Sequence, residues 1–211
     1  MEPLLLVDKP KGITSFDVIR RLRKELGIRK MGHAGTLDPL ASGLMLIGVN
    51  EGTKLLASLI KLPKSYDAEI VLGELRSTGD QEGELLASCA VADIPKEEIE
   101  EALRRMVGTL LLPVPAYSAI KKNGVPLYKR ARRGEEVETP VRPMEVTSAT
   151  LTKVERHGDK LHLHVSFDVG SGTYIRSLAE KLGSKLGYPA ALVNLRRTSI
   201  GEYRVEDARS V

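Results

Sequence analysis

Residues 144–169 carry a pattern that argues against a purely parallel sheet. The stretch MEVTSATLTKVER is followed by the turn HGD and by KLHLHVSFDV, in which Leu161, Leu163, Val165 and Phe167 alternate with other residues. A period of two predicts a long antiparallel hairpin with one buried face. Because strand and helix patterns do not alternate regularly elsewhere, we expect a mixed α+β domain rather than a doubly wound parallel sheet.

The other elements are predicted from periodicity and from start and stop signals. Thr14 and Asp17 have capping-box spacing and Gly27 follows an apolar stripe, so a helix is expected over 15–26. Pro95 begins a second helix, with acids first and arginines later. Further expectations are strands over 4–8, 43–49, 66–72 and 191–203, a short helix from 51, a helix over 174–186, and loops over 32–43 and 77–84.

Length and composition favour one domain of residues 1–211. No apolar run is long enough to span a bilayer and no charged-then-apolar leader follows Met1, so we expect a soluble, cytoplasmic protein without a membrane contact. Cys89 is the only cysteine, which excludes an intramolecular disulfide and a thiolate metal cage. We expect it to be a small buried hydrophobic residue.

Positive charge is concentrated in one segment. The net charge is only +4, but six Lys or Arg and no acid lie between Tyr117 and Arg133. The surrounding stretch, about 113–143, is rich in Pro, Gly and basic residues and has little periodicity. We interpret it as an inserted arm that gains order against a phosphate backbone, with a solvated loop as the alternative.

The stretch GHAGTLDPLASG, residues 32–43, sets Asp38 and His33 among small residues. Small neighbours let a ligand approach the carboxylate closely, and Pro39 holds Asp38 extended. An ionised acid presented on a stiff loop is the functional interpretation, and an Asx-Pro turn is the alternative. His33 is open to three interpretations: a base, a ligand or a structural histidine.

GSGTYIRSLAEKLG, from Gly170, places Tyr174 and Arg176 where the chain enters a helix. An arginine there is suited to a bidentate contact with a catalytic carboxylate or with phosphate, and a surface helix arginine is the alternative.

Two other sites are weaker hypotheses. His162 and His164 share a strand face, but no acid or cysteine motif accompanies them, so we expect an exposed hairpin face and no metal site. Asp38 and Asp80 would be a glycosidase pair only at a defined separation, which sequence cannot measure.

Taken together, these stretches resemble the TruB family of tRNA pseudouridine-55 synthases. The resemblance runs nearly end to end through KPKG, GHAGTLDPLASG, KSYDAEIVLG, TGDQEG, PAYSAIKKNGVPLYKRARRG, GTYIRSLA and LRRTSIG. It implies the pseudouridine synthase fold, a central mixed, mostly antiparallel sheet flanked by helices and loops, with the basic arm inserted. It also implies a reaction without metal or organic cofactor, in which uracil is detached from its ribose, turned and rejoined through C5.

The resemblance also implies roles for individual residues. Asp38 is the indispensable carboxylate, acting as a nucleophile or as acceptor of a ribose proton, and Arg176 forms the ion pair that positions it. Because the target uridine is stacked, the base must be flipped out. The remaining roles are a stacking platform (Tyr66), a group against the RNA loop (His33), a pocket wall (Tyr174, Leu195), support of the N-terminal loop (Lys9) and RNA contacts from the arm (Lys121, Lys122, Arg130, Arg132).

The implied partner is the T arm of tRNA, with no obligate protein partner and a monomeric enzyme. The chain departs from the family pattern at Leu112, Val114, Arg76, Lys181 and Val169–Ser171, none of which is an implied catalytic position. It also stops at Val211, where most bacterial members continue into a C-terminal domain of the PUA type. Two alternatives stay open: an RNA-binding or tRNA-folding protein, and a guide-RNA-dependent synthase.

Overall fold

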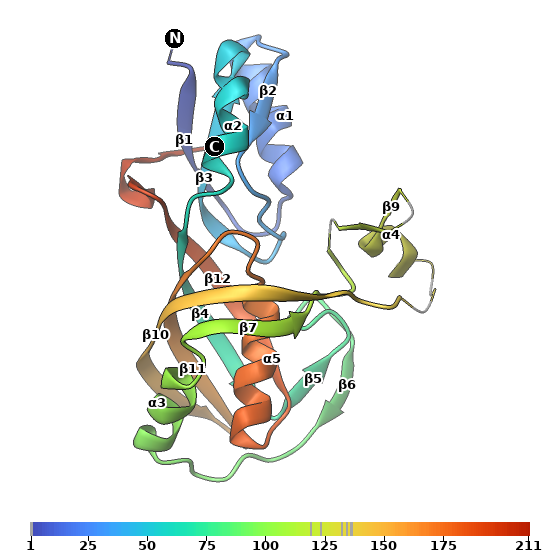
Figure 1. The fold of residues 1–211 in the computed structure, drawn as a ribbon, viewed down its shortest axis with the longest axis vertical. Helices are drawn as coiled ribbons and strands as arrows, with labels where there is room; N and C mark the ends of the chain where they lie inside the picture. Colours follow the sequence, from blue (N-terminus) through green and yellow to red (C-terminus); the bar gives the residue numbers. More distant parts are fainter. Residues whose placement is uncertain (1, 119, 123, 132, 134, 136) are drawn as a thin grey trace.

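The computed structural model describes residues 2–118, 120–122, 124–131, 133, 135 and 137–211. Among these residues, ten strands form one sheet with the main order β14-β1-β3-β12-β4-β11-β10-β7, to which β2 adds beside β3 and β13 beside β12 (Figure 1). The strands are β1 (Leu4–Lys9), β2 (Met31–His33), β3 (Ser42–Val49), β4 (Lys64–Leu72), β7 (Gly108–Pro113), β10 (Val141–His157), β11 (Lys160–Val169), β12 (Ala190–Ile200), β13 (Tyr203–Arg204) and β14 (Arg209–Ser210).

The sheet is mixed and mostly antiparallel. The β1–β14 and β3–β12 pairs are parallel, and the other described pairs of this sheet are antiparallel. The hairpin expected from residues 144–169 is confirmed as β10 and β11, and the apolar residues of β11 from Leu161 to Phe167 are buried. The α+β prediction is therefore confirmed.

The helices are α1 (Ser15–Leu26), α2 (Leu56–Leu59), α3 (Lys96–Arg104), α4 (Leu127–Ala131) and α5 (Ile175–Leu186), with 3-10 turns η1 (Asn50–Leu55) and η2 (Val205–Asp207). Helix α1 has the predicted capping box: the Thr14 hydroxyl accepts a bond from the Asp17 N–H, and Asp17 accepts one from the Thr14 N–H. Gly27 ends the helix at φ +70°, which glycine adopts without strain.

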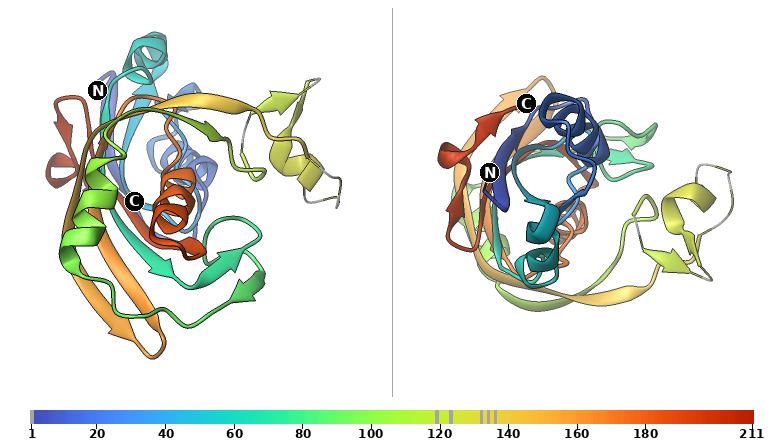
Figure 2. Two further views of the ribbon diagram at one scale, coloured as in Figure 1. Left: turned by 60° about the horizontal axis from the view of Figure 1, so that its bottom comes forward. Right: turned by 90° about the horizontal axis from the view of Figure 1, so that it is seen from above.

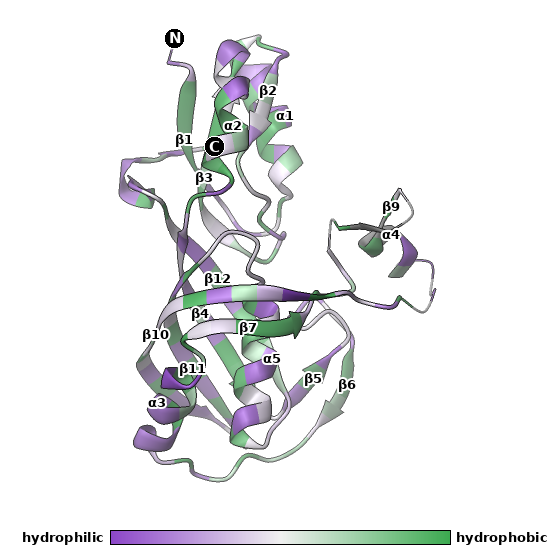
Figure 3. Ribbon diagram, viewed as in Figure 1, coloured by the Kyte–Doolittle hydropathy of each residue, from purple (hydrophilic) through white to green (hydrophobic). Residues whose placement is uncertain are grey.

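The larger of two hydrophobic clusters packs α1, α3 and α5 against the sheet, and a smaller cluster includes Leu44 and Leu46 of β3. The sheet curves around α5 (Figure 2), whose inward residues Leu178, Ala179 and Leu182 are fully buried. Strand β3 is buried from Gly43 to Val49, and its central residues, Leu44 to Ile47, are hydrophobic (Figure 3). The curved sheet and the N-terminus of α5 thus provide a rigid frame for the loop that connects β2 to β3.

The basic segment leaves the sheet between β7 and β10. It contains β8 (Lys121–Lys122), β9 (Val125–Pro126) and α4, and it projects away from the body of the molecule (Figure 1). Leu127 is buried, and its N–H donates to the Ile120 carbonyl. Ile120 packs against the main hydrophobic core, so this contact ties the described part of the arm to the body of the molecule.

Several local expectations differ from the structure. The expected 32–43 loop is shorter, because its first residues belong to β2 and its last two to β3. Cys89 is exposed, because it follows a small surface hairpin, β5 (Glu74–Arg76) and β6 (Leu85–Ser88), whose second strand is wholly exposed. That hairpin flanks the predicted 77–84 loop and was not foreseen. The short helix from 51 is instead η1 followed by α2. None of the described helices has the length and apolar character needed to cross a membrane.

Candidate active site

Asp38 lies in the loop between β2 and β3, which is fixed from both sides. On one side, the Leu37 N–H donates to the Ser15 hydroxyl (2.8 Å), and that hydroxyl donates to the Leu37 carbonyl (3.0 Å). On the other side, the Gly12 N–H donates to the Pro39 carbonyl (2.8 Å). Helix α1 and the turn after β1 therefore hold the backbone on either side of Asp38.

The side chain of Lys9 also holds this loop in place through hydrogen bonds. Its ammonium is fully buried and donates to the carbonyls of Ala41 (2.6 Å), Pro10 (2.9 Å) and Pro39 (3.4 Å). Burial lowers the pKa of Lys9 to about 8, although the nearby Asp38 carboxylate acts in the opposite direction. Lys9 thus joins the turn after β1 to the Asp38 loop. The support of the N-terminal loop that the resemblance implies stays a prediction.

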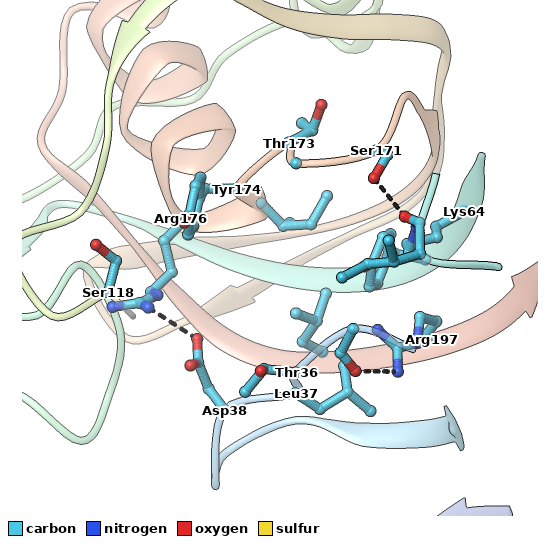
Figure 4. A pocket seen from close by; sticks show the side chains of 16 residues that line it. Thr36, Leu37, Asp38, Lys64, Ser118, Ser171, Thr173, Tyr174, Arg176 and Arg197 are labelled. Atoms are coloured by element: carbon cyan, nitrogen blue, oxygen red, sulfur yellow. Dashed lines mark hydrogen bonds and ion pairs between the residues drawn. The ribbon is translucent and has the colours of Figure 1, made fainter. Parts of the chain in front are cut away.

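Arg176, the second residue of α5, forms an ion pair with Asp38. Its Nη2 lies 2.8 Å from Asp38 Oδ2 (Figure 4). The guanidinium also donates to the carbonyls of Thr78 (2.9 Å) and Tyr117 (3.0 Å). The Arg176 side chain is 5% exposed and that of Asp38 is 40% exposed, so a buried cation holds an accessible carboxylate.

Asp80 is a second acid of this network, which the sequence suggested only as one member of a glycosidase acid pair. Its Oδ2 lies 3.7 Å from Arg176 Nε, and its carboxylate accepts bonds from the Thr78 hydroxyl and the Glu82 N–H. Because Asp80 is buried against the same guanidinium as Asp38, the two acids do not face a substrate from opposite sides as glycosidase acids do. The position of Asp80 within the motif TGDQEG was the sequence feature that could have pointed to a role at the site.

Glu82 adds a third carboxylate near this network. Burial, and then the neighbouring Asp80 and Asp38, raise the pKa of Glu82 above its usual range. Three carboxylates, those of Asp38, Asp80 and Glu82, therefore lie near one another. The Arg176 guanidinium compensates this negative charge through its ion pairs with Asp38 and Asp80.

A cavity of about 280 Å³ opens beside Asp38, close to the lower end of small-molecule pockets at about 300 Å³. Tyr66, for which the resemblance implies a stacking role, and Tyr174 and Leu195, for which it implies a place in the pocket wall, all line this cavity. Tyr66 comes from β4 and Leu195 from β12, which are neighbouring strands. Burial raises the pKa of Tyr174 above its usual range.

Two cations that we did not single out from the sequence also line the cavity, Lys64 and Arg197. Arg197 stands opposite Tyr66 across the β4–β12 pair, and Lys64 lies two residues before Tyr66 on the same face. Burial lowers the pKa of Lys64 to about 8, and the positive charge of Arg197 contributes to the same shift.

Some predicted residues lie away from the cavity. His33 is half-buried on β2, and its Nδ1 is buried without a hydrogen-bond partner among the described residues. Burial lowers the pKa of His33, and the positive charge of Arg197 lowers it further. In the arm, Lys121 and Lys122 form β8, Arg130 pairs with Glu135 at 2.7 Å, and Arg132 lies outside the described residues.

The hairpin histidines differ from the expectation of an exposed face without acids. His162 Nδ1 lies 2.8 Å from Glu69 Oε1, and His164 Nε2 lies 2.7 Å from Glu155 Oε2, both in partly buried positions. The acids come from other positions in the chain, which a local motif search does not reveal. No group of three or more potential metal ligands occurs within the described part of the chain.

Comparison with known proteins identifies the family to which the chain is similar. Residues 23–175 match the family model described as TruB family pseudouridylate synthase, N-terminal domain. tRNA pseudouridine synthase B of Corynebacterium efficiens is 42% identical over 97% of this chain and 69% of its own. The enzyme of the same name from Mycobacterium tuberculosis (H37Rv) is 40% identical over 99% of this chain and 70% of its own.

Two solved structures have the same fold. A chain in a crystal structure of a Cbf5–Nop10–Gar1 complex is 26% identical with a TM-score of 0.72, over 99% of this chain and 52% of that one. A chain of an H/ACA RNP bound to a substrate RNA is 24% identical with a TM-score of 0.70, over 98% and 50%. Our chain thus spans about half the length of these two.

The matched family and the named relatives define the class, which is that of enzymes that convert uridine into pseudouridine. The chain belongs to the TruB family of pseudouridylate synthases.

Proposed function

We propose that this chain isomerises uridine 55 in the T loop of tRNA to pseudouridine, with Asp38 as the essential carboxylate. The observation that carries the proposal is the 2.8 Å ion pair between buried Arg176 and accessible Asp38 beside a cavity. Relatives about 40% identical are named for tRNA, whereas the Cbf5 complex chain is 26% identical. The tRNA substrate is therefore favoured over a guide-RNA-dependent reaction.

The reaction balances without a co-substrate. The bond between ribose C1′ and uracil N1 breaks, the base turns, and C1′ bonds to C5. The proton on C5 is released, and N1 takes up a proton. Asp38 either attacks C1′ or the base as a nucleophile, or removes a ribose proton. In each route the carboxylate must be ionised and fixed in direction, which is what the Arg176 contact provides.

The base reaches this carboxylate by leaving its stack, at a cost of a few kcal/mol. We propose that Tyr66 stacks on the flipped base, with Leu195 and Tyr174 enclosing it; these three side chains line the cavity. His33 would occupy the space that the base leaves in the RNA, and the arm would contact the phosphate backbone. We infer that the enzyme acts as a monomer, without a guide RNA, a protein partner or a cofactor.

The test is release of tritium from tRNA labelled at uridine C5, with purified protein alone. We expect the wild type to release tritium and Asp38→Asn to be slower by at least about 10³-fold, since the amide is neither a nucleophile nor a base. Asp67→Asn is the matched control, because Asp67 is exposed on β4 beside Tyr66. Mapping pseudouridine in the treated tRNA then identifies the modified position.

Equal release by the wild type and Asp38→Asn would refute the proposed chemistry. Tight tRNA binding without any release would instead favour an RNA-binding or tRNA-folding protein. A requirement for added guide RNA would favour the guide-dependent alternative.

A further inference from the structure

We propose that Lys64 and Arg197 form a phosphate-binding subsite, which takes the phosphodiester adjoining the nucleotide whose base enters the cavity. The inference rests on the proposed function for the identity of that nucleotide. It assigns a ligand to two buried cations that the chemistry at Asp38 does not use.

Both cations face the same small region of the cavity wall. A Cβ built on Gly35 would lie 3.5 Å from Arg197 Nη1 and 3.6 Å from Lys64 Cε, so both side chains pass close to one point. Figure 4 shows them on one side of the cavity and Asp38 with Arg176 on the other. The carboxylate and the two cations are therefore arranged to contact different parts of one ligand.

The present hydrogen bonds of the two cations go to neutral carbonyl groups. The Lys64 ammonium donates to Ile60 (3.0 Å) and Leu62 (2.7 Å). Arg197 donates from Nε to Leu44 (2.7 Å) and from Nη2 to Gly35 (3.2 Å). An ammonium has three N–H groups and a guanidinium five, so donors remain on both.

Neither cation has an acidic partner among the ion pairs that the described residues form. The contrast with Arg176 is informative, since that buried cation contacts both Asp38 and Asp80. Lys64 is 7% exposed and Arg197 is 1% exposed. Two buried like charges without an acid are unfavourable, which indicates that the missing anion comes from a ligand.

The position of Lys64 also departs from the pattern of its strand. On β4 the inward residues after Tyr66 are Ala68, Ile70 and Leu72, all apolar and buried. Lys64 continues the same face with a charge. A buried polar residue that breaks a strand's pattern is expected at functional sites rather than in a core built for stability alone.

The ligand's chemistry follows from the cavity. A nucleotide within an RNA chain brings one phosphodiester on each side of its ribose, each with one negative charge. Lys64 supplies a compact charge, and Arg197 supplies a planar group that matches two phosphate oxygens. Fixing this phosphate would orient the ribose, and hence C1′, toward Asp38 on the opposite side.

The first half of the test uses wild-type protein and modified RNA. T-arm stem-loops are made with an uncharged methylphosphonate at the phosphate 5′ of the target uridine, at the phosphate 3′ of it, or at a stem phosphate as control. We expect one of the two flanking substitutions to weaken binding about tenfold, the size of one charge-assisted hydrogen bond. The stem substitution should leave the affinity unchanged.

The second half uses Lys64→Gln, which keeps N–H donors for the carbonyls but removes the charge. It should weaken binding of unsubstituted RNA about tenfold, and lower the slope of log affinity against log salt by about one. It should show no further loss with the sensitive methylphosphonate RNA, because both changes remove the same contact. Lys61→Gln, an exposed lysine three residues earlier, is the matched control and should behave as the wild type.

Wild-type binding that is insensitive to both flanking substitutions overturns the proposal, whether or not Lys64→Gln folds. Equal further loss in Lys64→Gln and wild type also overturns it, since the lysine would then act only through structure. Circular dichroism establishes folding of the variant. Tritium release from unsubstituted RNA by the wild type reports on the proposed function separately, so failure of that function and failure of this subsite are distinguishable.

Discussion

Lys9 shows how one buried charge can determine where a carboxylate stands. Its three carbonyl acceptors lie at the end of β1 and on both residues that flank Leu40, just after Asp38. A neutral side chain of similar size would fill the space but remove the charged donor from all three carbonyls, of which Pro39 would keep its bond from the Gly12 N–H. The residue therefore acts on Asp38 through the backbone.

We expect Lys9→Met to lower the free energy of unfolding by about 2–4 kcal/mol, because buried carbonyls would lose a charged donor. Urea denaturation measures this. We further expect kcat for tritium release to fall more than KM rises, because the loop that holds Asp38 would shift. Lys11→Met is the control, since Lys11 is exposed in the same turn. A variant with unchanged stability and kcat would show that Lys9 does not support the loop.

At the site, the sequence identified residues whose neighbours in the chain are unusual. Asp38 stands among small residues, and Arg176 stands at a helix start after Gly-Ser-Gly. For Arg176, the residues alone left carboxylate and phosphate open as partners, and only the resemblance chose the carboxylate. Lys64 and Arg197 lie in the quoted stretches KSYDAEIVLG and LRRTSIG, but nothing in either stretch marks the two cations as a pair. Only the cross-strand register of β4 and β12 brings them to one wall.

At the scale of elements, local signals predicted well and long-range pairing did not. Helix α1 was predicted with its cap and its end, and the β10–β11 hairpin with its buried face. The parallel β3–β12 pair joins segments about 150 residues apart in the chain, and no local pattern encodes it. The β5–β6 hairpin was missed because its second strand has no buried face and hence no alternation.

The arm carries the next prediction. Replacing Lys121, Lys122, Arg130 and Arg132 together by Ala should weaken tRNA binding and lower the slope of log affinity against log salt by up to about four, because each cation on a phosphate releases about one counterion. The loss will be smaller if Arg130 stays paired with Glu135 in the complex. Filter binding over a salt series measures both quantities.

The matched control replaces four exposed cations on α3, at its C-cap and on β10: Lys96, Arg104, Arg105 and Lys153. These should change the slope little, since Figure 1 shows α3 far from the arm. An unchanged slope in the arm variant would mean that this segment is only a solvated loop.

On the scale of the whole molecule, buried cations set the response of stability to pH. Burial lowers the pKa of Lys9 and of Lys64 to about 8 from 10.5. The unfolded chain keeps both protons until about pH 10.4. Between these limits the unfolded state binds more protons than the folded state, so the free energy of unfolding must rise with pH. Below pH 8 both states are protonated and this contribution to the slope vanishes.

We therefore expect the free energy of unfolding to rise between pH 8 and 9.5, by at most about 1.4 kcal/mol per pH unit for each lysine. Above about pH 10 the sign reverses for Tyr174, whose raised pKa lets the folded chain keep a proton that the unfolded chain loses. Urea denaturation at half-unit pH steps measures the curve, and Lys64→Gln should reduce its slope by the share of one lysine. If the wild-type and Lys64→Gln slopes coincide, Lys64 does not change its protonation on unfolding. Burial at the cavity wall would then disfavour the charged form of Lys64 less than its lowered pKa implies.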